Sequence, residues 1–208
     1  MHQPRKNSIV QQVFSWYIDY LFKRDFSSYS YTTDLNVKED EAILLLSNHF
    51  SWWDGFVMVY LNKRVFKKQF HVLVTGEDYK KQWFLKYFGG FAPEQKGKDV
   101  VETLLYAGHL LDDPLNLVLL FPQGKLHSGH VGSITFEKGI MQVLNASKKK
   151  FQVVFSATLC DYFNQRKPQM RTYLKEWEAE EYVSLQLLKS EYNKHYDHAL
   201  KQQSKIAL

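Results

Sequence analysis

Short apolar runs alternate with longer amphipathic segments along most of the chain. The apolar runs are bounded by turn residues, which is typical of strands that are buried on both faces of a sheet. These predicted strands cover 42–47, 70–75, 116–121 and 151–159. The segments between them carry apolar residues at helical spacing and predict helices at 52–64, 77–88, 97–113 and 133–147. Such alternation predicts an α/β fold in a single domain, with a mostly parallel β-sheet flanked by helices.

The two ends of the chain carry different patterns. Residues 8–22 have apolar side chains at helical spacing, interrupted by polar ones, and predict an amphipathic helix that either packs on the core or lies in a membrane interface. From about residue 174 the chain is rich in helix formers, and a helical tail is expected. We therefore divide the single domain into an N-terminal helix, an α/β core and a C-terminal helical tail, at 1–30, 31–172 and 173–208.

Composition narrows the class of protein. The 208 residues are 45% hydrophobic and 24% charged, so a disordered or collagen-like chain is excluded. Aromatic residues reach 16%, which suits a buried core, a ligand pocket or a membrane interface. The formal charge of +5 and a pI near 9.0 are compatible with an anionic partner, such as a phospholipid surface, an acyl carrier protein or a cofactor phosphate. The basic residues do not cluster as nucleic-acid binding requires, so no nucleic-acid partner is expected.

The single cysteine, Cys160, excludes an internal disulfide and a cysteine-based zinc site. The N-terminal residues 1–8 lack the apolar block of a signal peptide, and no apolar run approaches the roughly 20 residues of a membrane span. The sequence therefore favours a cytoplasmic protein that binds peripherally to the inner face of the membrane. No metal and no permanently bound cofactor are expected, because no second histidine or cysteine lies at ligand spacing near the ionisable pair described next.

The stretch LLLSNHFSWWDGF, residues 44–56, places two ionisable groups directly after a predicted strand. In open α/β sheets ligands bind at the carboxyl ends of the strands, where His49 and Asp54 would lie. Ser51 is the expected N-cap of the next helix, so that Asp54 falls in its first turn and His49 in the preceding loop. The pair then either forms a general base and its orienting carboxylate, or Ser51 and Asp54 form a helix-capping box beside a structural histidine.

Several blocks resemble those of the glycerolipid acyltransferase family of the PlsC type, which includes lysophosphatidic acid acyltransferases. NHFSWWD matches its His-x4-Asp signature, and three later blocks follow in the family's order: GGFAPEQK (89–96), FPQGK (121–125) and FEKG (136–139). The resemblance covers roughly residues 31–160 and implies a glycerol-3-phosphate acyltransferase-like fold. It also implies that His49 deprotonates an acceptor hydroxyl, that Asp54 orients His49, and that the hydroxyl attacks the thioester of acyl-CoA or an acyl carrier protein.

The third block departs from the family's usual Phe-Pro-Glu-Gly-Thr-Arg. Gln123, Lys125 and Leu126 replace Glu, Thr and Arg, so the arginine expected to grip a glycerol phosphate is absent. Lys96, at the arginine position of the second block, and Lys125 either bind a phosphate of acceptor or donor, or are solvated surface lysines. The acceptor is then another lyso-lipid, or a lipid-like alcohol or amine.

The remaining substrate-binding residues that the resemblance implies are Phe121, Pro122 and Gly124 of the third block. Trp52 and Trp53 either wall an acyl tunnel or pack the helix onto the sheet. Two other functions use the same features. A thioesterase would use the His–Asp pair with water in place of the acceptor, and a non-enzymatic protein would bind lipid through its basic surface.

Overall fold

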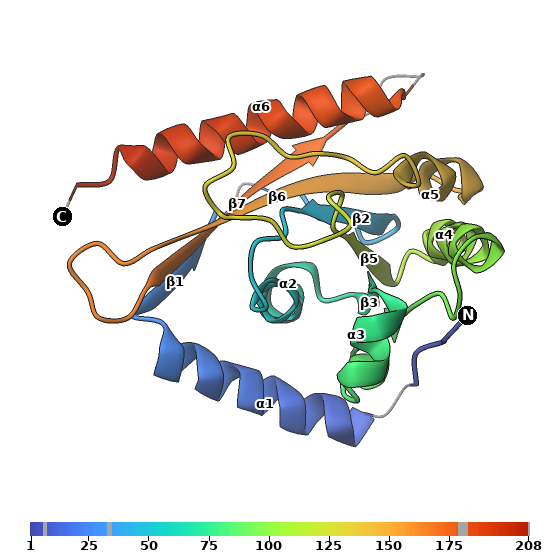
Figure 1. The fold of residues 1–208 in the computed structure, drawn as a ribbon, viewed down its shortest axis with the longest axis horizontal. Coiled ribbons are helices and arrows are strands. Elements are labelled where there is room, and N and C mark those ends of the chain that lie inside the picture. Colours follow the sequence, from blue (N-terminus) through green and yellow to red (C-terminus); the bar gives the residue numbers. More distant parts are fainter. Residues whose placement is uncertain (6–7, 33–34, 179–182, 208) are drawn as a thin grey trace.

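A seven-stranded sheet forms the centre of the computed structural model, which describes residues 1–5, 8–32, 35–178 and 183–207 (Figure 1). The strand order is β1-β7-β6-β2-β5-β3-β4. The strands are β1 (Ser28–Tyr31), β2 (Ala42–Ser47), β3 (Gln69–Leu73), β4 (Gly90–Phe91), β5 (Asn116–Leu120), β6 (Phe151–Asp161) and β7 (Gln169–Trp177). All neighbouring pairs are parallel except β6 and β7, which confirms the predicted single α/β domain with a mostly parallel sheet.

Helices cover both faces of this sheet. They are α1 (Ser8–Asp25), α2 (Asp54–Leu61), α3 (Gly76–Lys81), α4 (Lys98–Leu110), α5 (Ile140–Ala146) and α6 (Leu185–Ser204). Figure 1 places α6, α5 and α4 above and to the right of the sheet, with α1, α2 and α3 below it. A π-helical turn at Asn62–Phe66 extends α2, and a 3-10 turn at Leu85–Phe88 precedes β4.

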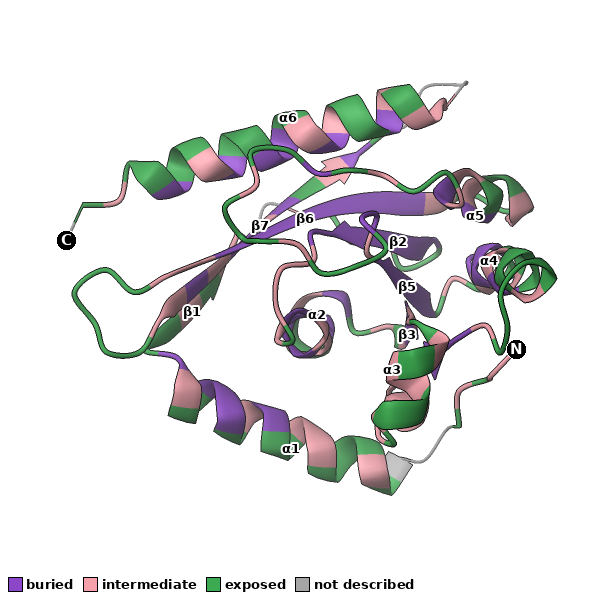
Figure 2. Cartoon of the chain, viewed as in Figure 1, coloured by how far each residue is buried: buried purple, intermediate pink, exposed green. Residues whose placement is uncertain are grey.

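The central strand β2 is fully buried because its side chains alternate between two cores (Figure 2). Leu44 and Leu46 join the core that α4, α5 and α6 cover, which includes Tyr192. Ile43 and Leu45 join the opposite core beneath α1 and α2. A strand buried on both faces has an apolar residue at every position, and this is why the run AILLL predicted it correctly.

Register sets which loops meet at the carboxyl edge. Leu46 of β2 lies beside Leu120 of β5, and Ser47 lies beside Ser156 of β6. The loop that follows β2 therefore begins next to the loop that follows β5. The motif at 49–54 and the motif at 121–125 are more than sixty residues apart in sequence, yet strand pairing brings them together.

The structure corrects the prediction that the C-terminal tail is helical from residue 173 or 174 onward. Residues 169–177 form β7, which pairs antiparallel with β6, and α6 begins only at Leu185. Helix propensity in this stretch is overridden by pairing with β6 and by burial of Met170, Thr172 and Leu174 on one face. The short β1, which pairs with β7, is also absent from the predicted elements.

Two predicted helices are shorter than expected. The helix predicted at 133–147 forms only at Ile140–Ala146, because Asn193 of α6 binds both the N–H and the C=O of Ile134 and holds that segment extended. The helix predicted at 77–88 is divided at Gln82 into α3 and the 3-10 turn. The other predicted strands and helices form within a few residues of their predicted ends, and GGFAP contains the short β4.

Helix α6 contains a buried histidine that gives stability a pH dependence. The Nε2–H of His195 donates to the Tyr173 carbonyl at 3.0 Å, and burial lowers the pKa of His195 to about 4. Between the ordinary pKa of about 6.5 and pH 4, the unfolded chain binds a proton that the folded chain does not. We predict that the unfolding free energy decreases as the pH is lowered through this window, by about 3 kcal/mol from His195 alone.

Urea unfolding of His195→Gln at pH 7 and pH 4.5 tests this prediction. The variant should lose less of its unfolding free energy between the two pH values than the wild type. His198→Gln, which replaces an exposed histidine on the same helix, is the control and should behave as the wild type. Equal pH dependence in all three proteins would contradict a buried neutral His195.

Candidate active site

His49 and Asp54 meet at the carboxyl edge of the sheet. His49 Nδ1 lies 2.8 Å from Asp54 Oδ2. A carboxylate can only accept, so Nδ1 carries the hydrogen and the neutral ring keeps its lone pair on Nε2. Asp54 is 0% exposed, whereas His49 is partly exposed and lines a cavity. The arrangement is that of a base whose tautomer is set by a buried carboxylate.

The backbone of the loop supplies the rest of the support for Asp54. The N–H groups of Phe50 and Ser51 donate to the same Oδ2 at 2.8 and 2.9 Å. Burial raises the pKa of Asp54, while the hydrogen bonds from His49 and these two amides oppose the rise. The carboxylate thus orders the turn and the histidine together.

The expected N-cap at Ser51 is wrong in detail. The α-helix begins at Asp54, Trp53 occupies the N-cap position, and the hydroxyl of Ser51 accepts the Trp53 N–H at 3.1 Å. Half of the capping box remains, because Asp54 still accepts the Ser51 N–H. The capping and the base-orienting interpretations are therefore compatible: one carboxylate does both.

The third block holds His49 from the other side. The ring of Phe121 stacks on the imidazole with centroids 4.1 Å apart, and the side-chain oxygen of the buried Gln123 accepts the His49 N–H at 2.7 Å. The His127 N–H donates to the His49 carbonyl at 3.0 Å. Gln123 thus acts on the backbone of His49 instead of reaching the cavity.

Asn48 is a positioning residue that sequence reasoning missed. Its side chain donates to the Thr158 carbonyl at 2.9 Å and accepts the Thr158 N–H at 2.8 Å, so it continues the pairing of β2 with β6 by one residue. The available signal was a polar amide directly after a fully apolar strand, where an unpaired amide would be costly.

A cavity of about 520 Å³ opens beside the imidazole. Its volume falls within the usual range for small-molecule sites. Apolar side chains from five parts of the chain form most of its wall: Phe56 and Val59 of α2, Val72 of β3, Phe84 and Phe88 near the 3-10 turn, Leu104 of α4 and Ile140 of α5. These wall residues, at positions between 56 and 140, were not among the predicted site residues.

The structure brings some of the predicted substrate-binding residues to this cavity and not others. Trp52, Phe121, Pro122 and Gly124 line it. The side chains of Trp52 and Trp53 diverge: Trp52 is 50% exposed, whereas Trp53 contacts Phe22 and Phe26 in the core.

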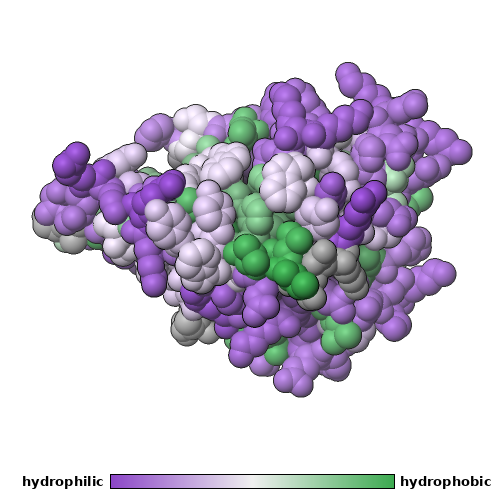
Figure 3. Space-filling view, turned by 90° about the horizontal axis from the view of Figure 1, so that it is seen from below, coloured by the Kyte–Doolittle hydropathy of each residue, from purple (hydrophilic) through white to green (hydrophobic). Residues whose placement is uncertain are grey.

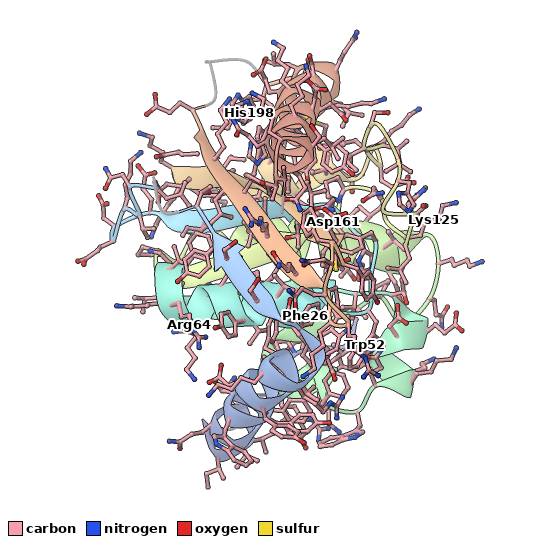
Figure 4. The ribbon with its side chains drawn as sticks, turned by 90° about the vertical axis from the view of Figure 1, so that its left-hand side faces the viewer. Phe26, Trp52, Arg64, Lys125, Asp161 and His198 are labelled. Carbon is pink, nitrogen blue, oxygen red and sulfur yellow. The ribbon has the colours of Figure 1, made fainter. Side chains whose placement is uncertain are left out.

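The two predicted phosphate-binding lysines, Lys96 and Lys125, are exposed and lie outside the cavity lining. In Figure 4, Lys125 projects from the same side of the molecule as Trp52, opposite Arg64. Neither lysine contributes to the cavity wall.

An open, mostly parallel sheet with a His–Asp pair and an apolar cavity at its carboxyl edge defines the class as an α/β protein with a ligand site at the strand ends. A family model named Acyltransferase matches residues 29–156, more than half of the chain. The chain therefore belongs to the acyltransferase family, as its sequence blocks suggested.

Two known proteins resemble this chain. A 1-acyl-sn-glycerol-3-phosphate acyltransferase of Streptococcus pneumoniae is 25% identical over 108 residues, which are 50% of this chain and 39% of that protein. The chain thus matches about two fifths of that relative's length. The crystal structure of the 1-acyl-sn-glycerophosphate (LPA) acyltransferase PlsC from Thermotoga maritima matches with a TM-score of 0.66 at 14% identity, over 95% of this chain and 81% of that one. At this identity the second likeness establishes the fold.

The turn at Phe121–Gly124 requires glycine at its end. Gly124 has φ of +68°, and a Cβ there would lie 3.0 Å from the Glu137 side chain. We predict that Gly124→Ala lowers the unfolding free energy by about 1–2 kcal/mol, because an L-residue is strained at positive φ. Gly132→Ala is the matched control: it lies in the same loop with open space around it and no positive φ. Urea unfolding should separate the two, and equal stability would contradict a required glycine.

Proposed function

We propose that this protein transfers a fatty acyl chain from a thioester, acyl-CoA or an acyl carrier protein thioester, to a hydroxyl or amine of a lyso-lipid or lipid-like acceptor. The observation that carries the proposal is the His49–Asp54 pair, with Nδ1 tied to a buried carboxylate and the ring lining an apolar cavity. Membership of the acyltransferase family supports the reaction class.

The proposed reaction begins with proton transfer from the acceptor hydroxyl to Nε2 of His49. The hydroxyl oxygen attacks the thioester carbonyl carbon, the carbon–sulfur bond breaks, and the imidazolium returns the proton to the leaving thiolate. Asp54 stabilises the imidazolium and holds its orientation. The products are an acyl ester and a free thiol, and no acyl-enzyme forms.

The other residues have proposed roles that follow from their positions. Trp52, Phe121, Pro122 and Gly124 contact the acyl chain or the reacting groups from the cavity wall, and Gln123 keeps the backbone of His49 in place. Lys96 and Lys125, which lie outside the cavity lining, bind phosphates of the donor's pantetheine arm as point charges. Trp53 is assigned to packing.

His49→Ala should abolish acyl transfer, and Asp54→Asn should lower kcat by about 100-fold or more, because the base loses its orienting charge. His130→Ala, at an exposed histidine of the β5–α5 loop, is the control and should retain wild-type turnover. Mass spectrometry of products with and without an added lyso-lipid distinguishes transfer from thioester hydrolysis. Wild-type turnover by folded His49→Ala would contradict the mechanism.

We also propose that α1 binds the inner face of the membrane. Ile9, Val13, Trp16 and Tyr20 recur at helical spacing, with exposed fractions between 51% and 73%. Figure 3, which views the side covered by α1, shows apolar side chains near the centre, with side chains of intermediate hydropathy beside and above them and hydrophilic ones below. Aromatic and aliphatic side chains in this arrangement suit the headgroup region of a bilayer. Within the described ranges, no helix has the length and apolar character that a membrane span requires.

The proposed membrane surface continues to the cavity. Trp83 is 60% exposed and contacts Phe14 of α1, while Phe84, next to it, contacts both Phe14 and the cavity residue Phe56. Trp52 contacts Phe56 at the far end of this row. These ring contacts connect α1 with the cavity wall, and we propose that a lyso-lipid reaches His49 along this row.

The double variant Ile9→Ser/Trp16→Ser should bind vesicles of phosphatidylethanolamine and phosphatidylglycerol about tenfold more weakly than the wild type in a sedimentation assay. Leu115→Ser replaces an apolar side chain of similar exposure in the α4–β5 loop and should have no effect. Unchanged partitioning of the double variant would remove α1 from the membrane contact.

A further inference from the structure

The charged groups around the cavity have the wrong sign for a phosphate monoester. Among the described residues that line it, the ionisable ones are His49, Asp78 and Glu137, and no lysine or arginine is present. The position that carries arginine in the family's usual third block is Leu126, which lines the cavity with an apolar side chain. An anionic head group would therefore meet carboxylates and no cation at the cavity wall.

Glu137 is the carboxylate closest to the third block. Its N–H donates to the Pro122 carbonyl at 2.8 Å, and its side chain packs against Gly124, where an added Cβ would lie 3.0 Å from its Cγ and 3.8 Å from its Oε1. Glu137 is thus attached to the turn whose Phe121 stacks on His49. Glu137 and His49 line the same cavity.

The carboxylates of Glu137 and Asp78 differ in their hydrogen bonding. The Thr75 hydroxyl donates to Asp78 at 2.6 Å at the start of α3, so that carboxylate is partly satisfied within the chain. In the part of the chain that the structure describes, the Glu137 carboxylate has no hydrogen bond and no ion pair. Glu137 is itself exposed, so its carboxylate lies where the cavity opens to solvent. Its basic neighbours in the β5–α5 loop, Lys125 and Lys138, are exposed too, but neither lines the cavity.

We propose that Glu137 selects an acceptor whose head group carries an ammonium ion and no phosphate monoester. This inference rests on the acyltransferase function proposed above and names its acceptor class: a single-chain lipid with a free hydroxyl and a nearby cationic nitrogen. The carboxylate pairs with the ammonium group and leaves the hydroxyl beside His49, while the alkyl chain fills the apolar wall. The same charge disfavours a phosphate monoester.

Three synthetic lyso-ether lipids test the proposal. They share one octadecyl chain and one free hydroxyl and differ only in the group on the remaining glycerol carbon: trimethylammonium, methoxy or phosphate monoester. Neither trimethylammonium nor methoxy can itself be acylated, so all three report transfer to the same hydroxyl. The readouts are kcat/KM for acylated lipid, with palmitoyl-CoA as donor, and the total release of thiol.

For the wild type we expect the order ammonium, then methoxy, then phosphate, with about a tenfold preference for ammonium over phosphate. Glu137→Gln should remove most of that preference, and Glu137→Lys should reverse it. Leu126→Arg, in a protein that keeps Glu137, should raise kcat/KM for the phosphate acceptor. Glu102→Gln, an exposed carboxylate on α4 outside the cavity lining, is the matched control and should keep the wild-type order.

Two outcomes would overturn the inference. One is a wild-type preference for the phosphate acceptor, and the other is an ammonium preference that Glu137→Gln leaves unchanged. Failure of the underlying function looks different: thiol would be released in a His49-dependent manner with no acylated lipid from any acceptor. That result would identify the protein as a thioesterase, and the proposed acceptor class would then no longer apply.

Discussion

The carboxylate of Asp54 is the group on which the arrangement of the site depends. An ionised carboxylate with 0% exposure is costly unless hydrogen bonds replace its water. One oxygen, Oδ2, receives three donors, from His49 Nδ1 and from the N–H groups of Phe50 and Ser51. The turn between β2 and α2 must adopt one conformation to supply them. The same bonds that keep the charge inside therefore place the imidazole, so stability of the turn and orientation of the base cannot be separated.

Strand register completes this arrangement from the opposite side. Because Leu46 and Leu120 are paired neighbours, the loops after β2 and β5 leave the sheet side by side. Phe121 then lies flat on the His49 ring, and Gln123 accepts the His49 N–H. Asn48 ties the start of the loop to Thr158 of β6. The position of His49 is thus fixed by contacts with the loops or edges of three strands, β2, β5 and β6.

The more deeply an element is buried, the more reliably its sequence predicts it. Strands such as β2 and β5 lie in the middle of the sheet, so their apolar runs are unambiguous. β7 is buried on one face only, and its other face is polar and rich in helix formers, so its sequence alone resembles that of a helix. Pairing with β6 makes this segment a strand. Residue spacing left the pairing of His49 with Asp54 as one of two interpretations, and the family resemblance favoured it. No local pattern distinguishes Trp52 at the cavity from Trp53 in the core. That difference depends on Phe22 and Phe26 of the distant α1 region.

Helix α1 connects the core to the proposed membrane contact because apolar residues lie on its buried side and also among its exposed residues. Ile18, Leu21 and Phe22 are buried against the sheet, while Ile9, Val13 and Trp16 face outward. A helix at the surface of a soluble domain usually has one apolar side and one polar side, so exposed apolar residues on α1 support the proposed membrane contact. A bilayer would cover them without a partner protein and would contain the single-chain lipids proposed as acceptors. Under that proposal, the aromatic row from Phe14 through Phe84 and Phe56 would keep the alkyl chain out of water between the bilayer and His49.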